Sequence, residues 1–262
     1  MFRIKMADLI IEIDNKYDFT YNLCRDYITN ECDHTDMRIC INDEAIAKER
    51  SEGLKPDFYN EDYCESICIY RAISHELTQF DALLIHAACI EMKGRVYAFL
   101  AKSGVGKSTH LGLWLRHYGK DAHIINGDKP IIRRINDTYM VYGTPWCGKE
   151  GLNINTHAPL KALCFLERND TNIISPLAAD KVIPRLANQI LIPNDSSAAK
   201  YLDLLDGMIT STPAYVLKCN MDEEAAVIAY EGFSTSKPFS TTNFCRPSMW
   251  VEPAFRLMFR PF

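Results

Sequence analysis

The sequence predicts an α/β fold with a mixed sheet, preceded by a small α+β segment. The first observation is an apolar run at Arg95–Leu100 that passes into a glycine-bearing turn and then a helical pattern over Lys107–Tyr118. The second is the apolar run 82–92, which a tight turn at Lys93 and Gly94 joins to the next strand as a hairpin. Strand-like and helical patterns then alternate, which indicates an α/β core.

The turn between the apolar run and the helical pattern has the composition of a phosphate-binding loop. Gly104 and Gly106 let the backbone curl, so that successive N–H groups point at phosphate oxygens where a helix begins. Lys107 would reach the β- and γ-phosphates, and the hydroxyl of Ser108, in preference to that of Thr109, would ligate magnesium. The expected nucleotide-binding residues are Ser103, Gly104, Val105, Gly106, Lys107, Ser108 and Thr109. The alternative is a glycine turn with an incidental lysine.

Composition and charge exclude several classes of protein. The 262 residues are 47% hydrophobic and 24% charged, as in ordinary globular proteins, with a formal net charge of -5. Basic residues do not cluster with aromatic ones, so we expect no nucleic-acid partner. The N-terminus does not resemble a secretory signal and no run of about 18 apolar residues occurs, so we expect a cytoplasmic protein without membrane contact. The 10 cysteines form no CxxC pair and are expected to be reduced.

The periodicity divides the chain into an N-terminal α+β segment (residues 1–80), a core (81–233) and a C-terminal tail or arm (234–262). In the N-terminal segment the predicted elements are strands at 8–14 and 37–41 and helices at 19–28, 44–50 and 61–80. In the core, the predicted strands are 82–92, Arg95–Leu100, Ala122–Asn126, Ile131–Ile135, 139–143, 161–168, Ile173–Leu177 and Ala214–Cys219. The predicted helices of the core are Lys107–Tyr118, 180–191, 198–210 and 222–233.

Phosphoryl transfer calls for a second acid beside the phosphates. Asp128 is the best candidate, because it follows the strand after the loop helix, at the carboxyl edge of the sheet. It could ligate the metal or accept a proton, and the alternative is that Gly127 and Asp128 form an ordinary turn. His86 is expected in the strand antiparallel to the one feeding the loop, where it could contact phosphate or assist proton transfer. A histidine satisfied within the core explains that position equally well.

Other polar and aromatic residues are weaker candidates. The cations that could clamp a phosphate or an anionic acceptor are Lys129, Lys149 and Arg168, each of which is weak evidence alone. The polar, glycine-bearing loop at 144–153 carries Trp146, which is expected to be exposed and could cover the nucleotide or the acceptor. Glu150 in the same loop could orient a hydroxyl nucleophile. A loop-anchoring ring and a solvated acid explain these two residues equally well.

These motifs together resemble the catalytic domain of HPr kinase/phosphorylase and the wider phosphoenolpyruvate-carboxykinase-like group of kinases. The matching segments read HAACIEMKG at 86–94, VYAFLAKSGVGKST at 96–109, NGD at 126–128 and GKEGLNIN at 148–155. The histidine-bearing hairpin is more characteristic of the family than the loop is. The motifs SGxGKSTH, NGDKP and GTPWxGKE look particularly like an uncharacterised bacterial branch of it.

The resemblance implies a P-loop core of this type and an ATP- and magnesium-dependent kinase. The implied reaction moves the γ-phosphate to a hydroxyl, preferably that of a serine, on a protein, a peptide or a small molecule. The implied acceptor-side histidine, phosphate lysine, metal hydroxyl and catalytic, metal-binding acid are His86, Lys107, Ser108 and Asp128. Two departures stand out: Gly127 occupies the place of the first of two adjacent aspartates, and Ala101 that of the first loop glycine.

Two further functions stay open at this point. One is a nucleotide-sensing binding module without phosphoryl transfer, which the missing first aspartate favours. The other is a simple nucleoside triphosphate hydrolase, which would release phosphate without an acceptor. Association into a homo-oligomer is open as well.

Overall fold

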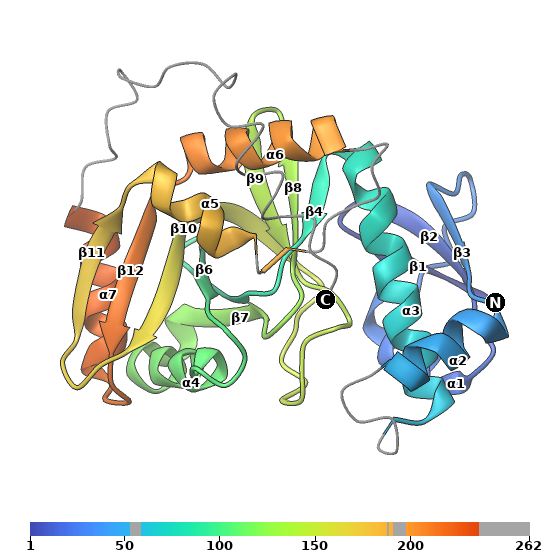
Figure 1. Cartoon of the computed structure of the whole chain (residues 1–262), viewed down its shortest axis with the longest axis horizontal. Coiled ribbons are helices and arrows are strands. Elements are labelled where there is room, and N and C mark those ends of the chain that lie inside the picture. The colour runs from blue at the N-terminus through green and yellow to red at the C-terminus, as the bar shows by residue number, and fades with distance from the viewer. Residues whose placement is uncertain (53–58, 188, 191–197, 236–262) are drawn as a thin grey trace.

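The computed structural model of the chain describes residues 1–52, 59–187, 189–190 and 198–235. Its N-terminal segment is a three-stranded sheet with helices packed beside it (Figure 1). The elements are β1 (Phe2–Met6), β2 (Leu9–Asp14), α1 (Asp18–Leu23), η1 (Arg25–Tyr27), β3 (Met37–Cys40), α2 (Asp43–Glu52), α3 (Glu61–Glu76) and η2 (Leu77–Phe80). Strand β2 is antiparallel to β1 and parallel to β3. The segment therefore has the α+β composition that the sequence predicts.

This segment differs from the prediction in two places, each at a turn. The strand predicted at 8–14 is β2, but a further strand that was not predicted, β1, precedes it, and Ala7 and Asp8 turn between the two with φ values of 54° and 56°. The helix expected at 19–28 ends at Leu23 and gives way to the 3-10 turn η1.

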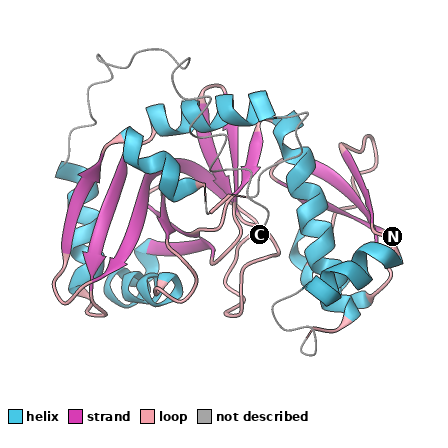
Figure 2. Ribbon diagram, viewed as in Figure 1, coloured by secondary structure: helices cyan, strands magenta, loops and turns pink. Residues whose placement is uncertain are grey.

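A second, larger sheet of nine strands forms the centre of the rest of the described chain (Figure 2). Its strands are β4 (Ala82–Leu84), β5 (Ala88–Met92), β6 (Arg95–Leu100), β7 (Ala122–Asn126), β8 (Ile131–Ile135), β9 (Thr138–Tyr142), β10 (His157–Arg168), β11 (Ile173–Leu177) and β12 (Ala214–Cys219). The order is β4-β8-β9-β10-β6-β5-β7, while β12 pairs with β10 and β11 pairs with β12.

The strand directions bring four carboxyl ends to one edge of this sheet. Strand β10 is parallel to β6 and to β12, whereas β5 is antiparallel to both β6 and β7. Strands β6, β7, β10 and β12 therefore all run in the same direction. The mixed sheet and the β5–β6 hairpin are confirmed, and the segments that follow these four strands lie at the edge where α/β proteins place their ligands.

The single strand predicted at 82–92 is wrong, because the run divides between two regions of the sheet. Its first part, β4, pairs with β8, and its last part, β5, pairs with β6 and β7. The intervening residues 85–87 cross from one region to the other. Strand β10 is longer than the predicted 161–168, because its first residues pair with β9.

Helices cover both faces of the large sheet, and the side chains of β6 alternate between them. Tyr97 and Phe99 pack into the buried cluster with α4 (Lys107–Tyr118) and α7 (Glu224–Thr235). Ala98 and Leu100 pack into the opposite cluster with α5 (Ala179–Leu186) and α6 (Ala198–Ser211). A strand buried on both faces reads as a continuous apolar run, which explains the pattern before the loop.

A third buried cluster joins the N-terminal segment to the large sheet. It combines Ile11 and Ile73 with Ile131 and Trp146. The division at residue 80 therefore stays a prediction, because the two parts share a core. Among the described residues, no helix has the length and apolar character needed to cross a bilayer. The nine cysteines that the structure describes are free thiols, as expected.

Two predictions lie partly or wholly outside the described residues. The helix expected at 180–191 is α5 as far as Leu186, and residues 188 and 191–197 are not described. The tail predicted at 234–262 lies outside the described residues from 236 onward.

Candidate functional site

The glycine-bearing loop connects the end of β6 to the start of α4. Gly104 and Gly106 have φ values of +79° and +126°, in the left-handed region where a side chain would strain the backbone. The N–H of His110 donates to the Gly106 carbonyl (2.9 Å) and closes the first helical turn. Within the described part of the chain, the N–H groups of Gly104 and Gly106 donate to no backbone carbonyl. The loop thus places backbone donors at a helix N-terminus, where anions bind.

Lys107, the first residue of α4, folds back over this loop. Its Nζ donates a 2.9 Å hydrogen bond to the carbonyl oxygen of Ala101, and the residue is only 8% exposed. Burial lowers the pKa of the ammonium from its ordinary value, while the negative charge of Asp128 opposes this shift. Lys107 and Asp128 follow β6 and β7, whose carboxyl ends lie at the same edge of the sheet.

Asp128 lies just after β7, and both of its carboxylate oxygens have partners. Nε2 of His86 is 2.9 Å from Oδ1, and Nζ of Lys129 is 2.8 Å from Oδ2. Burial acts to raise the pKa of this carboxyl, but the hydrogen bonds and charges of His86 and Lys129 outweigh it and lower the pKa to about 2. Asp128 is therefore ionised at neutral pH, whatever its role.

His86 reaches Asp128 from the crossing segment between β4 and β5, and its predicted place within a strand is wrong. Main-chain bonds fix this segment: the N–H of Ala87 donates to the Asp128 carbonyl (3.1 Å), and the N–H of His86 to the Gln189 carbonyl (2.6 Å). The imidazole is partly exposed and faces a carboxylate. The explanation as a core histidine among apolar neighbours is therefore wrong too.

The pairing of Asp128 predicts a specific pH dependence of stability. Its pKa is about 2 in the folded chain, against an ordinary value of 3.8, so the ion pairs stabilise the fold above about pH 4. This contribution is lost as the pH falls from about 4 to about 2. We therefore expect the free energy of unfolding to fall more steeply over this window in the parent than in Asp128→Asn. Urea denaturation from pH 5 to pH 2 measures both curves, and parallel curves would contradict the assignment.

Asn126, at the end of β7, shapes the turn that carries Asp128. Its Oδ1 accepts hydrogen bonds from the N–H groups of Asp128 (2.8 Å) and Lys129 (2.7 Å). Its Nδ2 donates to the carbonyl and to Oγ1 of Thr144 (2.9 and 3.1 Å), and Asn126 is fully buried. The site thus depends on an amide that we did not identify as functional. The signal was present in the NGD motif, since an asparagine two residues before the acid can cap its turn.

The lack of a side chain at Gly127 has a steric reason. A Cβ at this position would lie 2.7 Å from the carbonyl oxygen of Cys147 and 3.5 Å from that of Leu152. The N–H of Gly127 also donates to the Leu152 carbonyl (2.9 Å). The loop after β9 therefore occupies the space that a first aspartate would need.

This contact predicts that Gly127→Ala is destabilising. The new methyl group would push against backbone, which gives way less readily than a side chain, so we expect a loss of about 1–3 kcal/mol in the free energy of unfolding. Urea denaturation measures the loss. Gly112→Ala in α4 is the matched control, because the nearest atom to its Cβ is the flexible end of Arg116 at 3.5 Å. The control should be neutral or more stable by up to about 1 kcal/mol; equal stability of both variants would contradict the steric account.

Trp146 anchors the loop at 144–153 and is not the exposed ring that the sequence predicted. Trp146 is buried (8% exposed), and its Nε1 donates a 3.0 Å hydrogen bond to Oγ of Ser66 on α3. Its ring also lies 5.9 Å from that of Tyr70. A covering role over nucleotide or acceptor is therefore wrong, and the loop-anchoring explanation is confirmed.

Two exposed residues of this loop lie close in sequence to its contact with Asp128. A Cβ on Gly148 would be 3.2 Å from the Cβ of Asp128, so the loop backbone passes directly beside the acid. Lys149 and Glu150 follow and are both exposed. The structure thus brings this loop to Asp128, whereas the roles of the two side chains stay predictions.

Arg168, at the end of β10, lies beside the glycine loop and is engaged with it. Its Nε donates to the Val105 carbonyl (3.0 Å), and its guanidinium also donates to the Gly104 carbonyl. The side chain therefore fixes the backbone of the loop. As a clamp on phosphate, the role that the sequence suggested, it would first have to exchange these bonds.

The donor set is compatible with a magnesium ion held jointly with phosphate. The described residues contain no group of three or more His, Cys, Asp and Glu side chains able to hold a metal alone. Magnesium, however, is commonly bound through one or two protein oxygens together with substrate phosphates. The ionised carboxylate of Asp128 and the hydroxyl of Ser108, one residue after Lys107, are oxygen ligands of this kind. These residues fit the ion on chemistry.

Comparisons with known proteins add little to this description. No family model matches the chain, and no curated protein is significantly similar to it. Among solved structures, the Hpr(Ser) kinase/phosphatase from Coxiella burnetii matches with a TM-score of 0.28 and 11% sequence identity. The match covers 46% of this chain and 86% of that chain. So weak a similarity identifies no family, and function has to be argued from the site.

Proposed function

We propose that this protein is an ATP- and magnesium-dependent kinase that transfers the γ-phosphate to a hydroxyl, preferably a serine hydroxyl of a protein, peptide or small molecule. The observation that supports the proposal is the meeting of two groups at one sheet edge. The glycine loop with Lys107 follows β6, and Asp128 follows the parallel strand β7. Burial lowers the pKa of Lys107, and the negative charge of Asp128 opposes this shift, as expected for an ammonium and a carboxylate at one edge of the sheet.

In this proposal the chain holds the phosphates and neutralises their charge. Backbone N–H groups of the loop and the Lys107 ammonium bind the β- and γ-phosphates, and the ammonium leaves the Ala101 carbonyl to do so. Ser108 and Asp128 would hold magnesium, which would neutralise charge on the phosphates. Binding of an anion also compensates the buried Lys107 charge, which the carbonyl of Ala101 satisfies only partly.

Asp128 has a second role, in orienting the acceptor hydroxyl. A carboxylate with a pKa of about 2 is a weak proton acceptor, so its contribution is mainly to align the O–H through a hydrogen bond. The loose transition state of phosphoryl transfer needs little proton removal before the P–O bond forms. As the new P–O bond forms, the bond to ADP breaks and ADP leaves, while the hydroxyl proton, aligned by its hydrogen bond to Asp128, is lost to water. His86 and Lys129 hold the carboxylate in position for this step.

One observation favours a second candidate, a nucleotide-sensing module without phosphoryl transfer. Both oxygens of Asp128 are already paired, and Gly127 has no room for a first aspartate. In such a module the bound nucleotide would only change contacts around Asp128. A hydrolase, in contrast, would use water as the acceptor.

Turnover separates these functions. The parent is incubated with Mg-ATP alone and then with free serine, serine-bearing peptides or cell extract, and ADP release is measured. A kinase releases ADP only when an acceptor is present and the acceptor gains mass of one phosphoryl group. Binding without ADP release in any mixture would favour the module, and release without an acceptor would favour the hydrolase.

A further inference from the structure

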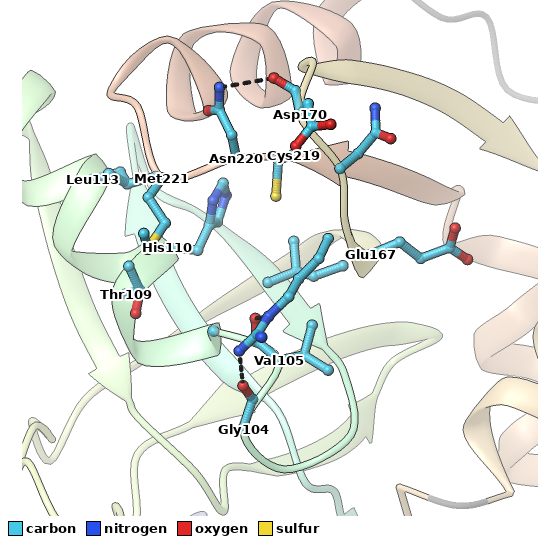
Figure 3. Close-up of a pocket in the computed structure, with 14 residues that line it drawn as sticks. Gly104, Val105, Thr109, His110, Leu113, Glu167, Asp170, Cys219, Asn220 and Met221 are labelled. Atoms are coloured by element: carbon cyan, nitrogen blue, oxygen red, sulfur yellow. Dashed lines mark hydrogen bonds between the residues drawn. The ribbon is translucent and has the colours of Figure 1, made fainter.

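A cleft of about 670 Å³ opens beside the glycine loop (Figure 3). Its walls come from the loop, the first two turns of α4, and the ends of β10 and β12 with the residues that follow them. Gly104, Val105 and Gly106 belong both to the proposed phosphate site and to this cleft. A ligand whose phosphates occupy the loop would therefore extend directly into the cleft.

His110 lines this cleft and is almost completely buried, with 2% of its surface exposed. Its Nε2 accepts a 3.0 Å hydrogen bond from Nε1 of Trp114, one turn further along α4. An imidazole nitrogen that accepts a hydrogen bond carries no proton, so the proton of the neutral ring is on Nδ1. Burial lowers the pKa of His110 to about 3, which keeps the ring neutral.

The Nδ1–H donor of His110 has no hydrogen-bond partner among the described residues. Leaving a buried donor unpaired costs about 1–3 kcal/mol. Buried polar groups are paired in the great majority of proteins, with protein groups or with ordered water, so this orphan beside the cleft indicates an acceptor from outside the chain. His110 is not one of the residues that hold the phosphates in the proposed site, so a second part of the ligand is a candidate for this acceptor.

The remaining walls suit a flat heterocycle. Leu113 and Leu166 give the cleft apolar surface, while Asn220 and Asp170 place polar groups at it. Figure 3 shows the bond from Nδ2 of Asn220 to the Asp170 carbonyl (3.2 Å), which fixes this side. A cavity of several hundred Å³ with apolar walls and a few polar groups is typical of small-molecule sites.

We propose that this cleft is the nucleoside subsite and that the Nδ1–H of His110 donates to an acceptor atom of the purine base. The inference rests on the proposed nucleotide site at the glycine loop, and it adds His110 as a residue that recognises the base through a hydrogen bond. His110 acts by binding and takes no part in the chemistry.

The test compares Mg-ATP with Mg-tripolyphosphate, which has the phosphates and lacks the nucleoside. Isothermal titration measures both affinities for the parent and for His110→Phe. We expect His110→Phe to weaken ATP binding about 10-fold, the usual cost of a lost buried hydrogen bond, and to leave tripolyphosphate binding unchanged. Lys107→Ala should weaken both ligands, which separates the two sites.

A second variant keeps the test valid if His110→Phe does not fold, since this change also removes the partner of Trp114. Cys219→Phe adds a ring at the opposite wall, where Figure 3 draws the sulfur within the cleft. It should exclude the nucleoside and weaken ATP at least about 10-fold while sparing tripolyphosphate. Cys32→Phe, at an exposed thiol, is the control for the added ring.

The outcomes distinguish the two proposals. If Lys107→Ala weakens both ligands but the two cleft variants bind ATP as the parent does, the nucleoside subsite is wrong and the phosphate site stands. Equal loss of ATP and tripolyphosphate in the cleft variants also overturns the subsite. If the parent binds neither ligand, the proposed function itself fails, and the subsite with it.

Discussion

Lys107→Ala is expected to weaken Mg-ATP binding at least about 100-fold and to reduce transfer below detection. The ammonium is the buried positive charge beside the glycine loop, and the hydrogen bond that it makes within the described part of the chain, to the Ala101 carbonyl, is easily exchanged for phosphate oxygens. Loss of one preorganised donor to developing phosphate charge costs about 10²–10³ in rate. Isothermal titration gives the affinity, and labelled ATP gives the transfer rate.

The fold should survive this substitution, because it removes a buried charge together with its desolvation cost. Lys102→Ala is the matched control, since Lys102 lies in the same loop but is exposed. The control should bind nucleotide as the parent does. Nucleotide binding by Lys107→Ala at the parent's affinity would show that this loop does not hold phosphate.

Asp128→Asn has the second large effect that we expect, a fall of about 100-fold or more in transfer. The amide keeps the size of the side chain and one oxygen for His86, but it removes the charge that binds metal and aligns the hydroxyl. The loss should appear mainly in kcat, because the alignment matters in the transition state more than in the bound state. Initial rates over a range of ATP concentrations measure this difference.

Two further variants serve as comparisons for Asp128→Asn, one outside the site and one within it. Asp137→Asn changes an exposed aspartate in the β8–β9 turn, outside the site, and should keep the parent's rate. His86→Ala should reduce transfer less than Asp128→Asn does, because Lys129 still holds the carboxylate. Full transfer by Asp128→Asn would remove this residue from the mechanism.

The loop and its lead-in could be predicted from the sequence because their signals are local. Gly104 and Gly106 are required by positive φ angles, and glycine is the residue that adopts these without strain. The turn at Lys93 and Gly94 likewise requires positive φ (52° and 73°). The helix after the loop has the predicted bounds, Lys107–Tyr118, since Gly106 precedes it as the N-cap and Gly119 follows it as the C-cap.

The division of the run 82–92 could not be predicted, because which strand pairs with which is a property of the whole sheet. An apolar run gives the same pattern whether it pairs along its full length or changes partners in the middle. Where the run changes strand partners, His86 lies between β4 and β5 and contacts Asp128. The same change of pairing therefore determines both the sheet order and the position of His86 in the site. The burial of Trp146 could not be predicted for a related reason, because its hydrogen-bond partner, Ser66, is 80 residues away in the chain.

The supporting residues of the site were missed because their contacts are made by backbone. Asn126 acts through the N–H groups of the next two residues of its turn, and Gly127 through the lack of a side chain against the Cys147 carbonyl. Arg168 was identified as a cation, but its bonds go to the loop carbonyls and not to an open anion site. Residue type alone therefore indicated which side chains could take part in a site, while tertiary contacts decided what each side chain touches.

The most direct test of the proposed kinase is a transfer experiment with ATP labelled at the γ-phosphate. The parent, Lys107→Ala, Asp128→Asn and Asp137→Asn are each incubated with magnesium and the same panel of free serine, serine-bearing peptides and cell extract. We predict label on a serine hydroxyl with the parent and Asp137→Asn, about 100-fold less with Asp128→Asn, and none with Lys107→Ala. Label on no acceptor in the panel with the parent, although it binds Mg-ATP, would contradict the kinase and leave the binding module or the hydrolase.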